Sequence, residues 1–167
     1  MSDRFRLYIT RHGKAEPESE TGRDEDRPLR RKGERQAEFL VSHLLGADRH
    51  PTLILTSRLR RAIETSRILG EGLGCPVREE ATLGLGHPVS EVVEVLELLV
   101  RQSERDVMLV GHNPQVEMLV SVLTGGPSPQ PGMPRMRTGE CAILEFKGND
   151  VVGGARLLDL VRLVAAD

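Results

Sequence analysis

Two histidines of this chain stand directly after short apolar runs, where a side chain can meet a ligand. His12 follows Arg11 and the run at residues 7–9, and His112 follows the run at residues 107–110. An imidazole is a nucleophile or a proton carrier near neutral pH. A guanidinium group can hold a phosphate through two parallel hydrogen bonds. These residue types together predict nucleophilic chemistry on a phosphate or a similar anion.

A third apolar run, at residues 53–56, leads into Ser57 and then into a cluster of arginines, Arg58, Arg60 and Arg61. Ser57 is typical of a helix N-cap. Cations in the first turns of a helix oppose the helix dipole unless an anion lies nearby. We therefore expect at least one of these arginines to have an anionic partner. Arg58 and Arg60 are expected to be exposed, as most arginines are.

The elements that must position these groups alternate between strands and helices. Apolar runs predict strands at residues 7–9, 53–56, 75–77, 107–110 and 141–146. Helical spacing and capping residues predict helices that end at Gly46, begin at Ser57, begin at Ser90, and begin with Pro114 as first residue. Residues 155–164 fit a strand or a helix. The alternation predicts the α/β class, a three-layer α/β/α sandwich with a largely parallel central sheet, which gathers the strand ends at one edge.

Composition excludes several classes of protein. The 167 residues fit one domain, and no linker, repeat or second domain is visible, so residues 1–167 are expected to form a single domain. A net charge of -2 and an aromatic content of 2% favour neither nucleic acid nor a membrane surface as partner. No apolar run approaches the roughly 18 residues of a membrane span, and the start of the chain is no signal peptide. We expect a cytoplasmic protein.

The remaining segments carry weaker signals. Residues 14–27 predict a mobile loop beside the first strand end, and residues 124–134, rich in Gly and Pro, predict another loop. Cys75 and Cys141 lack metal-site spacing, and Cys141 is expected to be a small buried hydrophobe. The cations around residues 27–33 fit either a solvated helix start or a basic rim for an acidic or phosphorylated substrate.

Three motifs, in this order, resemble those of the histidine phosphatase superfamily, whose fold is that of the phosphoglycerate mutases. They are Arg11-His12-Gly13, the pattern Ser57-x-Leu59-x-Arg61-Ala62-x-x-Thr65, and Gly111-His112. The short chain, Arg27-Pro28-Leu29 followed by Lys32-Gly33, and Asn113-Pro114 after His112 resemble the small SixA-type phosphohistidine phosphatases. The resemblance spans about residues 7–146 and implies a phosphoglycerate mutase-like fold.

The resemblance also implies a covalent mechanism that needs no cofactor and no metal. His12 would attack phosphorus through a nitrogen left free because its other ring N–H is held by an acceptor, such as a backbone carbonyl. Arginines and the second histidine would stabilise charge on the phosphoryl oxygens. The implied catalytic residues are His12, Arg11, Arg61 and His112, and the implied phosphate-binding residues are Arg11, Gly13, Arg61, His112 and Asn113.

The chain departs from the mutases and many phosphomonoesterases of this superfamily, which carry a glutamate after the arginine motif as general acid for an alkoxide leaving group. Residues 81–88 contain no carboxylate, and the first one afterwards is Glu91. His87 is a candidate acid in this region, against a plain turn histidine, and Glu16 and Glu18 are candidates without positional support. An alkoxide leaving group needs protonation, whereas the imidazole of phosphohistidine can be protonated beforehand. The missing acid therefore favours an N-phosphate or an aryl phosphate.

Three functions remain open from the sequence. The leading one is a phosphatase for phosphohistidine in a signalling protein, since the chain lacks large insertions to enclose a small metabolite. The others are a broad phosphomonoesterase for small metabolites, or a mutase, and a phosphate-binding module without turnover. The expected partner is a phosphorylated protein or a small phosphate-bearing substrate, and we expect a monomer or a weak dimer. A basic rim would be formed by Arg27, Arg30, Arg31, Arg135 and Arg137.

Overall fold

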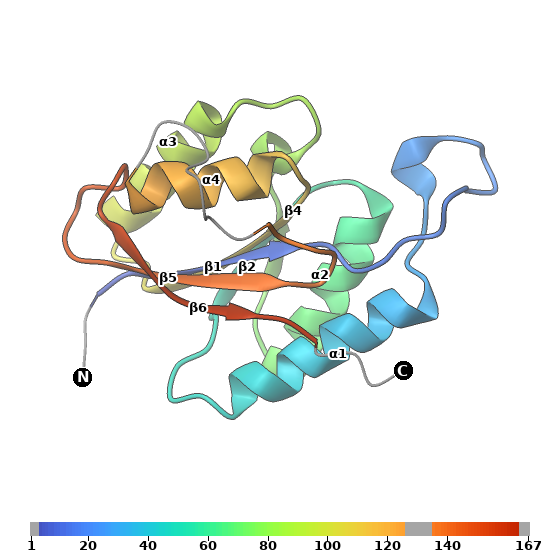
Figure 1. Cartoon of the computed structure of the whole chain (residues 1–167), viewed down its shortest axis with the longest axis horizontal. Helices are drawn as coiled ribbons and strands as arrows, with labels where there is room; N and C mark the ends of the chain where they lie inside the picture. Colours follow the sequence, from blue (N-terminus) through green and yellow to red (C-terminus); the bar gives the residue numbers. More distant parts are fainter. Residues whose placement is uncertain (1–3, 126–134, 164–167) are drawn as a thin grey trace.

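The computed structural model describes residues 4–125 and 135–163, in which strands and helices alternate along most of the chain (Figure 1). The strands are β1 (Arg6–Arg11), β2 (Leu53–Thr56), β3 (Val77–Glu79), β4 (Asp106–Gly111), β5 (Cys141–Phe146) and β6 (Ala155–Val161). The helices are α1 (Arg31–Leu45), α2 (Arg60–Leu73), α3 (Val89–Arg101) and α4 (Gln115–Thr124), with short 3-10 turns η1 (Asp24–Asp26) and η2 (Ala81–Leu83).

The strands form one sheet in the order β3-β2-β4-β1-β5-β6. The neighbours β3, β2, β4 and β1 pair in parallel, and β5 pairs antiparallel with both β1 and β6. Helices α3 and α4 cover one face of the sheet, and α1 and α2 cover the other (Figure 1). The predicted α/β/α sandwich with a largely parallel sheet is confirmed.

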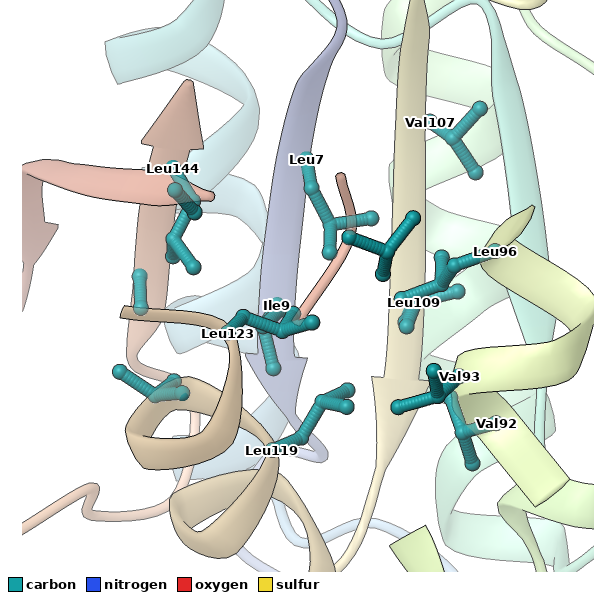
Figure 2. Packing of buried hydrophobic residues seen from close by; sticks show 14 of the residues in the cluster. Leu7, Ile9, Val92, Val93, Leu96, Val107, Leu109, Leu119, Leu123 and Leu144 are labelled. Atoms are coloured by element: carbon teal, nitrogen blue, oxygen red, sulfur yellow. The ribbon is translucent and has the colours of Figure 1, made fainter. Parts of the chain in front are cut away.

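Alternation along each central strand builds a hydrophobic core on both faces of the sheet. Leu7 and Ile9 of β1 pack on the α3 and α4 side, as Figure 2 shows, whereas Tyr8 between them packs on the α1 and α2 side. Successive side chains of a strand point to opposite faces. Leu96 of α3 is fully buried in the core on the α3 and α4 side, and burying such a side chain stabilises the fold by about 1.5–3 kcal/mol. The parallel strands are thus held rigidly from both sides.

The predicted helix starts at Ser57, Ser90 and Pro114 are each displaced by one to three residues. Helix α2 begins at Arg60 with Leu59 as N-cap, because the chain bends at residues 58–59 after β2 before it enters the helix. Helix α3 begins one residue before Ser90, at Val89, and Pro114 is the N-cap of α4 rather than its first residue. Capping preferences locate a helix start only to within a residue or two when the chain leaves a strand end.

The segments without clear periodicity are resolved in different ways. Residues 155–161 form an edge strand whose register shifts against β5, which explains why no regular alternation is visible there. In the segment at residues 124–134, for which a loop is predicted, Thr124 is the last residue of α4. Residues 126–134 lie outside the described part of the chain. Cys141 is buried, and burial raises the pKa of its thiol to about 12, as expected for a structural cysteine. None of the described helices is long and apolar enough to cross a membrane.

Candidate active site

Three strand ends meet at one edge of the sheet. Strands β2, β4 and β1 are parallel neighbours, with Thr56 opposite Val110 and Arg11 opposite Gly111. The residues that follow these ends surround a cavity of about 260 Å³. Ligands of open α/β sheets bind at such carboxyl edges. The cavity is lined by Arg11, His12, Lys14, Ala15, Arg27, Arg61, Leu85, His112, Asn113 and Thr138.

His12 is buried at the end of β1 with one ring nitrogen held by the backbone. Its Nδ1 lies 2.7 Å from the carbonyl oxygen of Gly13. A carbonyl only accepts hydrogen bonds, so Nδ1 carries the proton and Nε2 keeps its lone pair in the neutral ring. Burial, and then the charges of Arg61 and Arg11, lower the pKa of His12 to about 4 despite this hydrogen bond. At neutral pH the ring therefore presents an unprotonated Nε2.

The second histidine, His112, lies beside the first. The centroids of the two rings are 5.0 Å apart, and His112 is 3% exposed. Its Nε2 lies 2.7 Å from the hydroxyl of Ser57, and its Nδ1 is buried without a hydrogen-bond partner in the described structure. Burial, and then the nearby rings and charges, lower the pKa of His112 to about 3. Both histidines are therefore neutral at pH 7.

Arg11 and Asn113 share one anchor from the segment before β5. The Arg11 guanidinium donates to the Met136 carbonyl over 3.1 Å, and the Asn113 side-chain amide donates to the same oxygen over 2.8 Å. Burial lowers the pKa of Arg11, but an arginine side chain is not deprotonated in proteins. Arg11 thus carries a positive charge at the cavity wall, and no carboxylate within the described residues hydrogen-bonds it.

Arg61 is almost wholly buried in the first turn of α2, and its anionic partner is Asp24 of η1. The guanidinium donates to the Asp24 carbonyl over 2.9 Å and to its carboxylate over 3.1 Å. Arg27 donates to the other carboxylate oxygen over 2.9 Å. Burial would raise the pKa of Asp24, but the hydrogen bond and charge of Arg61 and the charge of Arg27 lower it overall. Asp24 is thus an ionised carboxylate that joins two arginines of the cavity wall.

Gly13 supports His12 from behind rather than lining the cavity. Its N–H donates to the Thr65 hydroxyl over 3.0 Å, and Thr65 in turn donates to the Arg61 carbonyl over 2.7 Å. A Cβ at Gly13 would lie 2.7 Å from the carbonyl oxygen of Gly33 in α1. Since its carbonyl and N–H are both engaged, Gly13 has no free backbone group for the phosphate contact that the motif implied. Without a Cβ, Gly13 lets the backbone after β1 approach Gly33 of α1 closely.

Most of the other predicted residues lie away from the cavity wall. His87 is exposed and its Nδ1 lies 2.8 Å from the carboxylate of Glu91, so this candidate acid is turned toward the first turn of α3. Leu85 stands at the cavity in its place. Arg58 and Arg60 are exposed, as predicted, and pair with Glu79 and Glu64. Of the predicted rim, Arg27 lines the cavity, whereas these residues are exposed without lining it: Arg30, Arg31, Arg135 and Arg137.

Three contacts of the site were not predicted from the sequence: the ion pair of Asp24 with Arg61, the hydrogen bonds by which Thr65 links Gly13 to Arg61, and the contact of Ser57 with His112. The signal for Asp24 was its place three residues before Arg27, in a loop where many residues are charged. Gln115 was also missed: its buried amide donates to the carbonyls of Thr82 and His87 and holds the loop that carries Leu85. The described residues contain no group of three or more side chains suited to hold a metal ion.

Comparison with known proteins agrees with this architecture. Residues 7–84 match the model of the histidine phosphatase superfamily (branch 1). An uncharacterized protein of Picosynechococcus sp. is 32% identical over 111 residues, which are 66% of this chain and 67% of that protein.

Solved structures add the subgroup. A structure of the protein histidine phosphatase SixA complexed with tungstate matches with a TM-score of 0.83 at 24% identity, covering 95% of this chain and 97% of that one. A protein of Agrobacterium tumefaciens assigned as the phosphohistidine phosphatase SixA matches with a TM-score of 0.73 at 27% identity, covering 95% and 98%. The chain therefore belongs to the histidine phosphatase superfamily and is a phosphatase of the SixA type.

Proposed function

We propose that this phosphatase removes the phosphoryl group from phosphohistidine in a signalling protein, through a covalent intermediate on His12. The observation that carries the proposal is the chemistry of the cavity wall. It combines two neutral imidazoles with Arg11, Arg61 and further cations, and none of the described lining residues is a carboxylic acid. Such a wall binds a phosphoryl group and offers a nucleophile, but it offers no carboxyl proton to a leaving group.

In the first step, the lone pair of His12 Nε2 attacks phosphorus. The bond between phosphorus and the leaving nitrogen breaks, and its electron pair goes to the substrate imidazole, which leaves neutral because its ring was protonated beforehand. Arg11 and Arg61 stabilise the charge on the phosphoryl oxygens, and His112 donates a hydrogen bond to them. Phosphoryl transfer is accelerated chiefly by alignment and by charge placed in advance.

In the second step, water attacks phosphorus opposite His12. The bond from phosphorus to Nε2 breaks, its electron pair returns to the imidazole, and inorganic phosphate leaves with the water oxygen. The proton lost by the water goes to solvent. The Gly13 carbonyl holds the proton of Nδ1 throughout, so His12 enters and leaves the cycle in the same tautomer. The positive charge in this scheme comes from the protein, and neither a metal nor an organic cofactor takes part.

The leaving group decides between an N-phosphate and an alkyl phosphate. An alkoxide needs a proton in the transition state, whereas a protonated imidazole does not. The loop that would have to supply an acid presents Leu85 to the cavity and turns His87 toward Glu91. This arrangement supports phosphohistidine over a small-molecule phosphomonoester, which stays the alternative. It gives the candidate acid His87 no support.

We further propose that residues 1–167 are one catalytic domain and that the substrate is a protein. The site uses residues from β1 to the segment before β5, where Thr138 lines the cavity, and β5 pairs with β1 to complete the same sheet. The cavity is small, and its basic wall includes Lys14 and Arg27 at the loop side. A phosphorylated side chain on a protein surface fits such a site. The cytoplasmic location, and a monomer or weak dimer, stay predictions.

The test is hydrolysis of a phosphohistidine protein, an aryl phosphate and an alkyl phosphate by the wild type and by His12→Ala, with a chelator present. His43→Ala is the matched control, because His43 is an exposed histidine of α1. We expect fast loss of phosphohistidine and slow turnover of the alkyl phosphate, with both activities abolished only in His12→Ala. Absence of an alkali-stable ³²P label on the wild-type protein during turnover would contradict the intermediate, and fast alkyl phosphate turnover would contradict the substrate class.

A further inference from the structure

Ser57 is buried between β2 and α2 and points its hydroxyl at the second histidine. It is 0% exposed, and its Oγ lies 2.7 Å from Nε2 of His112. Ser57 does not act as the helix N-cap that its position suggests, because the N-cap of α2 is Leu59. A serine buried at this place therefore needs another reason.

The direction of the hydrogen bond follows from the second contact of the same hydroxyl. The Leu59 N–H donates to Oγ over 3.3 Å and takes up one of its lone pairs. The hydroxyl hydrogen then needs an acceptor, and Nε2 of His112 is the one that the described structure provides. If Nε2 carried the hydrogen instead, the O–H of Ser57 would be buried without an acceptor, which costs on the order of 1–3 kcal/mol. The favoured arrangement is Ser57 O–H donating to His112 Nε2.

This direction decides where the proton of His112 lies. A neutral imidazole whose Nε2 accepts carries its hydrogen on Nδ1. Nδ1 is buried and has no partner among the described residues, although the ring itself lines the cavity. The other groups near the ring are His12, Arg61, Arg11 and Asp24, and the positive charges of the two arginines oppose a second proton on the ring. The free hydrogen-bond donor of His112 is thus Nδ1–H.

We propose that Ser57 is a positioning residue that holds His112 as the Nδ1–H tautomer, so that a neutral ring donates a hydrogen bond to the phosphoryl oxygens. His12 is also held as the Nδ1–H tautomer, by the Gly13 carbonyl. In His12, however, Nδ1–H is the anchored group and Nε2 is the reacting atom, whereas in His112 Nε2 is anchored and Nδ1–H faces the substrate. The inference rests on the role of His112 in the proposed function. It adds which ring nitrogen acts and what orients it.

The experiment compares Ser57→Ala and Ser57→Thr with the wild type by ¹⁵N NMR of the histidine rings and by kinetics on an aryl phosphate. In the wild type and in Ser57→Thr, His112 should show a protonated Nδ1 and a bare Nε2. In Ser57→Ala this pattern should be lost, and kcat should fall about ten- to hundredfold with a smaller change in KM, since a misdirected donor matters most in the transition state.

Ser66→Ala is the matched control, because Ser66, in α2, is also a fully buried serine and does not line the cavity. His112→Ala separates the two proposals. If it leaves kcat unchanged, the proposed role of His112 fails. If it lowers kcat while Ser57→Ala leaves either the tautomer or kcat as in the wild type, or matches Ser66→Ala in its effect on kcat, the inference about Ser57 alone is overturned.

Discussion

The two ends of strand β1 each carry an arginine, and the protein treats them in opposite ways. Arg6 at the amino end donates to the Glu145 carboxylate over 2.9 Å, whereas Arg11 at the carboxyl end donates to a backbone carbonyl. Burial would lower the pKa of Arg6, but Glu145 raises it overall; burial lowers the pKa of Arg11. At the amino end the charge is balanced for stability. At the carboxyl end, Glu117 and Glu140 act on Arg11 through their charges, but no carboxylate among the described residues hydrogen-bonds it.

The different pairing of Arg6 and Arg11 separates a structural charge from a functional one in this fold. Next to Arg6, Arg49 is paired in the same way, over 2.9 Å to Asp106. At the other end, Arg61 has the carboxylate of Asp24, but that side chain is 53% exposed and lies in the short 3-10 turn η1. A phosphate can compete with such a partner far more easily than with a buried one. The carboxyl end therefore keeps positive charge available for an anionic substrate.

The largest effect is expected when the arginine at the carboxyl end of β1 is removed. Arg11→Ala should lower kcat/KM by about 100- to 1000-fold, the usual loss for one group that stabilises transition-state charge. It should leave the free energy of unfolding unchanged or raised, because it removes a half-buried charge that no carboxylate among the described residues hydrogen-bonds. Steady-state kinetics and urea unfolding measure both. Arg101→Ala, at the exposed end of α3, is the control, and loss of stability in Arg11→Ala with activity retained would contradict the comparison.

As the pH falls, protonation should affect the carboxyl end of β1 before it affects the ion pair at the amino end. Below the His12 pKa of about 4, kcat/KM for an aryl phosphate, corrected for substrate ionisation, should fall about tenfold per pH unit as Nε2 is protonated. The pKa of Glu145 is held below its ordinary 4.5, so the ion pair of Arg6 persists to lower pH. A pH–rate profile of the wild type checks this, and an inflection near pH 6.5 would show that His12 is not desolvated.

The free energy of unfolding should also depend on the protonation of His12. The folded pKa of His12 lies below its ordinary 6.5, so the unfolded chain binds the proton more readily than the folded protein does. The free energy of unfolding should therefore be constant above pH 6.5 and decrease as the pH falls from there toward 4. Denaturant unfolding across this range should show a smaller decrease in His12→Phe than in the control His43→Ala.

Breaking the amino end should cost stability and spare catalysis. Arg6→Ala leaves the buried Glu145 with the more distant Arg4, at 3.5 Å, as partner, and should lower the free energy of unfolding by about 1–2 kcal/mol. kcat/KM per folded molecule should stay at the wild-type value. A double-mutant cycle with Glu145→Gln isolates the pair, and purely additive effects in that cycle would show that the ion pair contributes nothing.

A smaller effect is expected at the exposed cations beside the site. Arg30→Glu with Arg31→Glu should slow turnover of the phosphohistidine protein by about fivefold to tenfold and weaken its salt dependence, because these charges steer an acidic partner. Turnover of the aryl phosphate should not change. Arg101→Glu controls for net charge. If protein turnover and its salt dependence were untouched, the proposed protein surface would be wrong.

The smallest effect tests the exposed carboxylate at Arg61. Asp24→Asn should tighten product inhibition by inorganic phosphate about two- to fivefold, because the phosphate no longer competes with a charged partner for the guanidinium. The inhibition constant measures this, and Glu25→Gln, next to it in η1, is the control. Weaker phosphate binding in Asp24→Asn would mean that Asp24 mainly orients Arg61 and Arg27.

Much of this site can be predicted from the order of residues along the chain. Arg11, His12 and His112 stand at strand ends because each follows an apolar run, and parallel strands bring such ends together. The partners of these residues cannot be predicted in the same way. Asp24 and Ser57 belong to residue types that are common in loops and caps, and their contacts join positions 37 and 55 residues apart. The contact of His87 with Glu91 was missed although it is local.

The amino-acid sequence by itself therefore determined the α/β class, the strands that form the catalytic edge and the residue types that stand on it, because hydrophobic periodicity and polar residues at strand ends are local properties. Only the tertiary structure decided the tautomers of His12 and His112, the partner of Arg61 and the placing of His87 outside the cavity. These depend on distances and directions between segments remote in the chain, which follow from how α1, α2 and the loop at residues 14–29 pack around the sheet. Hydrogen bonds are sensitive to geometry at the level of tenths of an ångström, and no pattern along the chain carries that information.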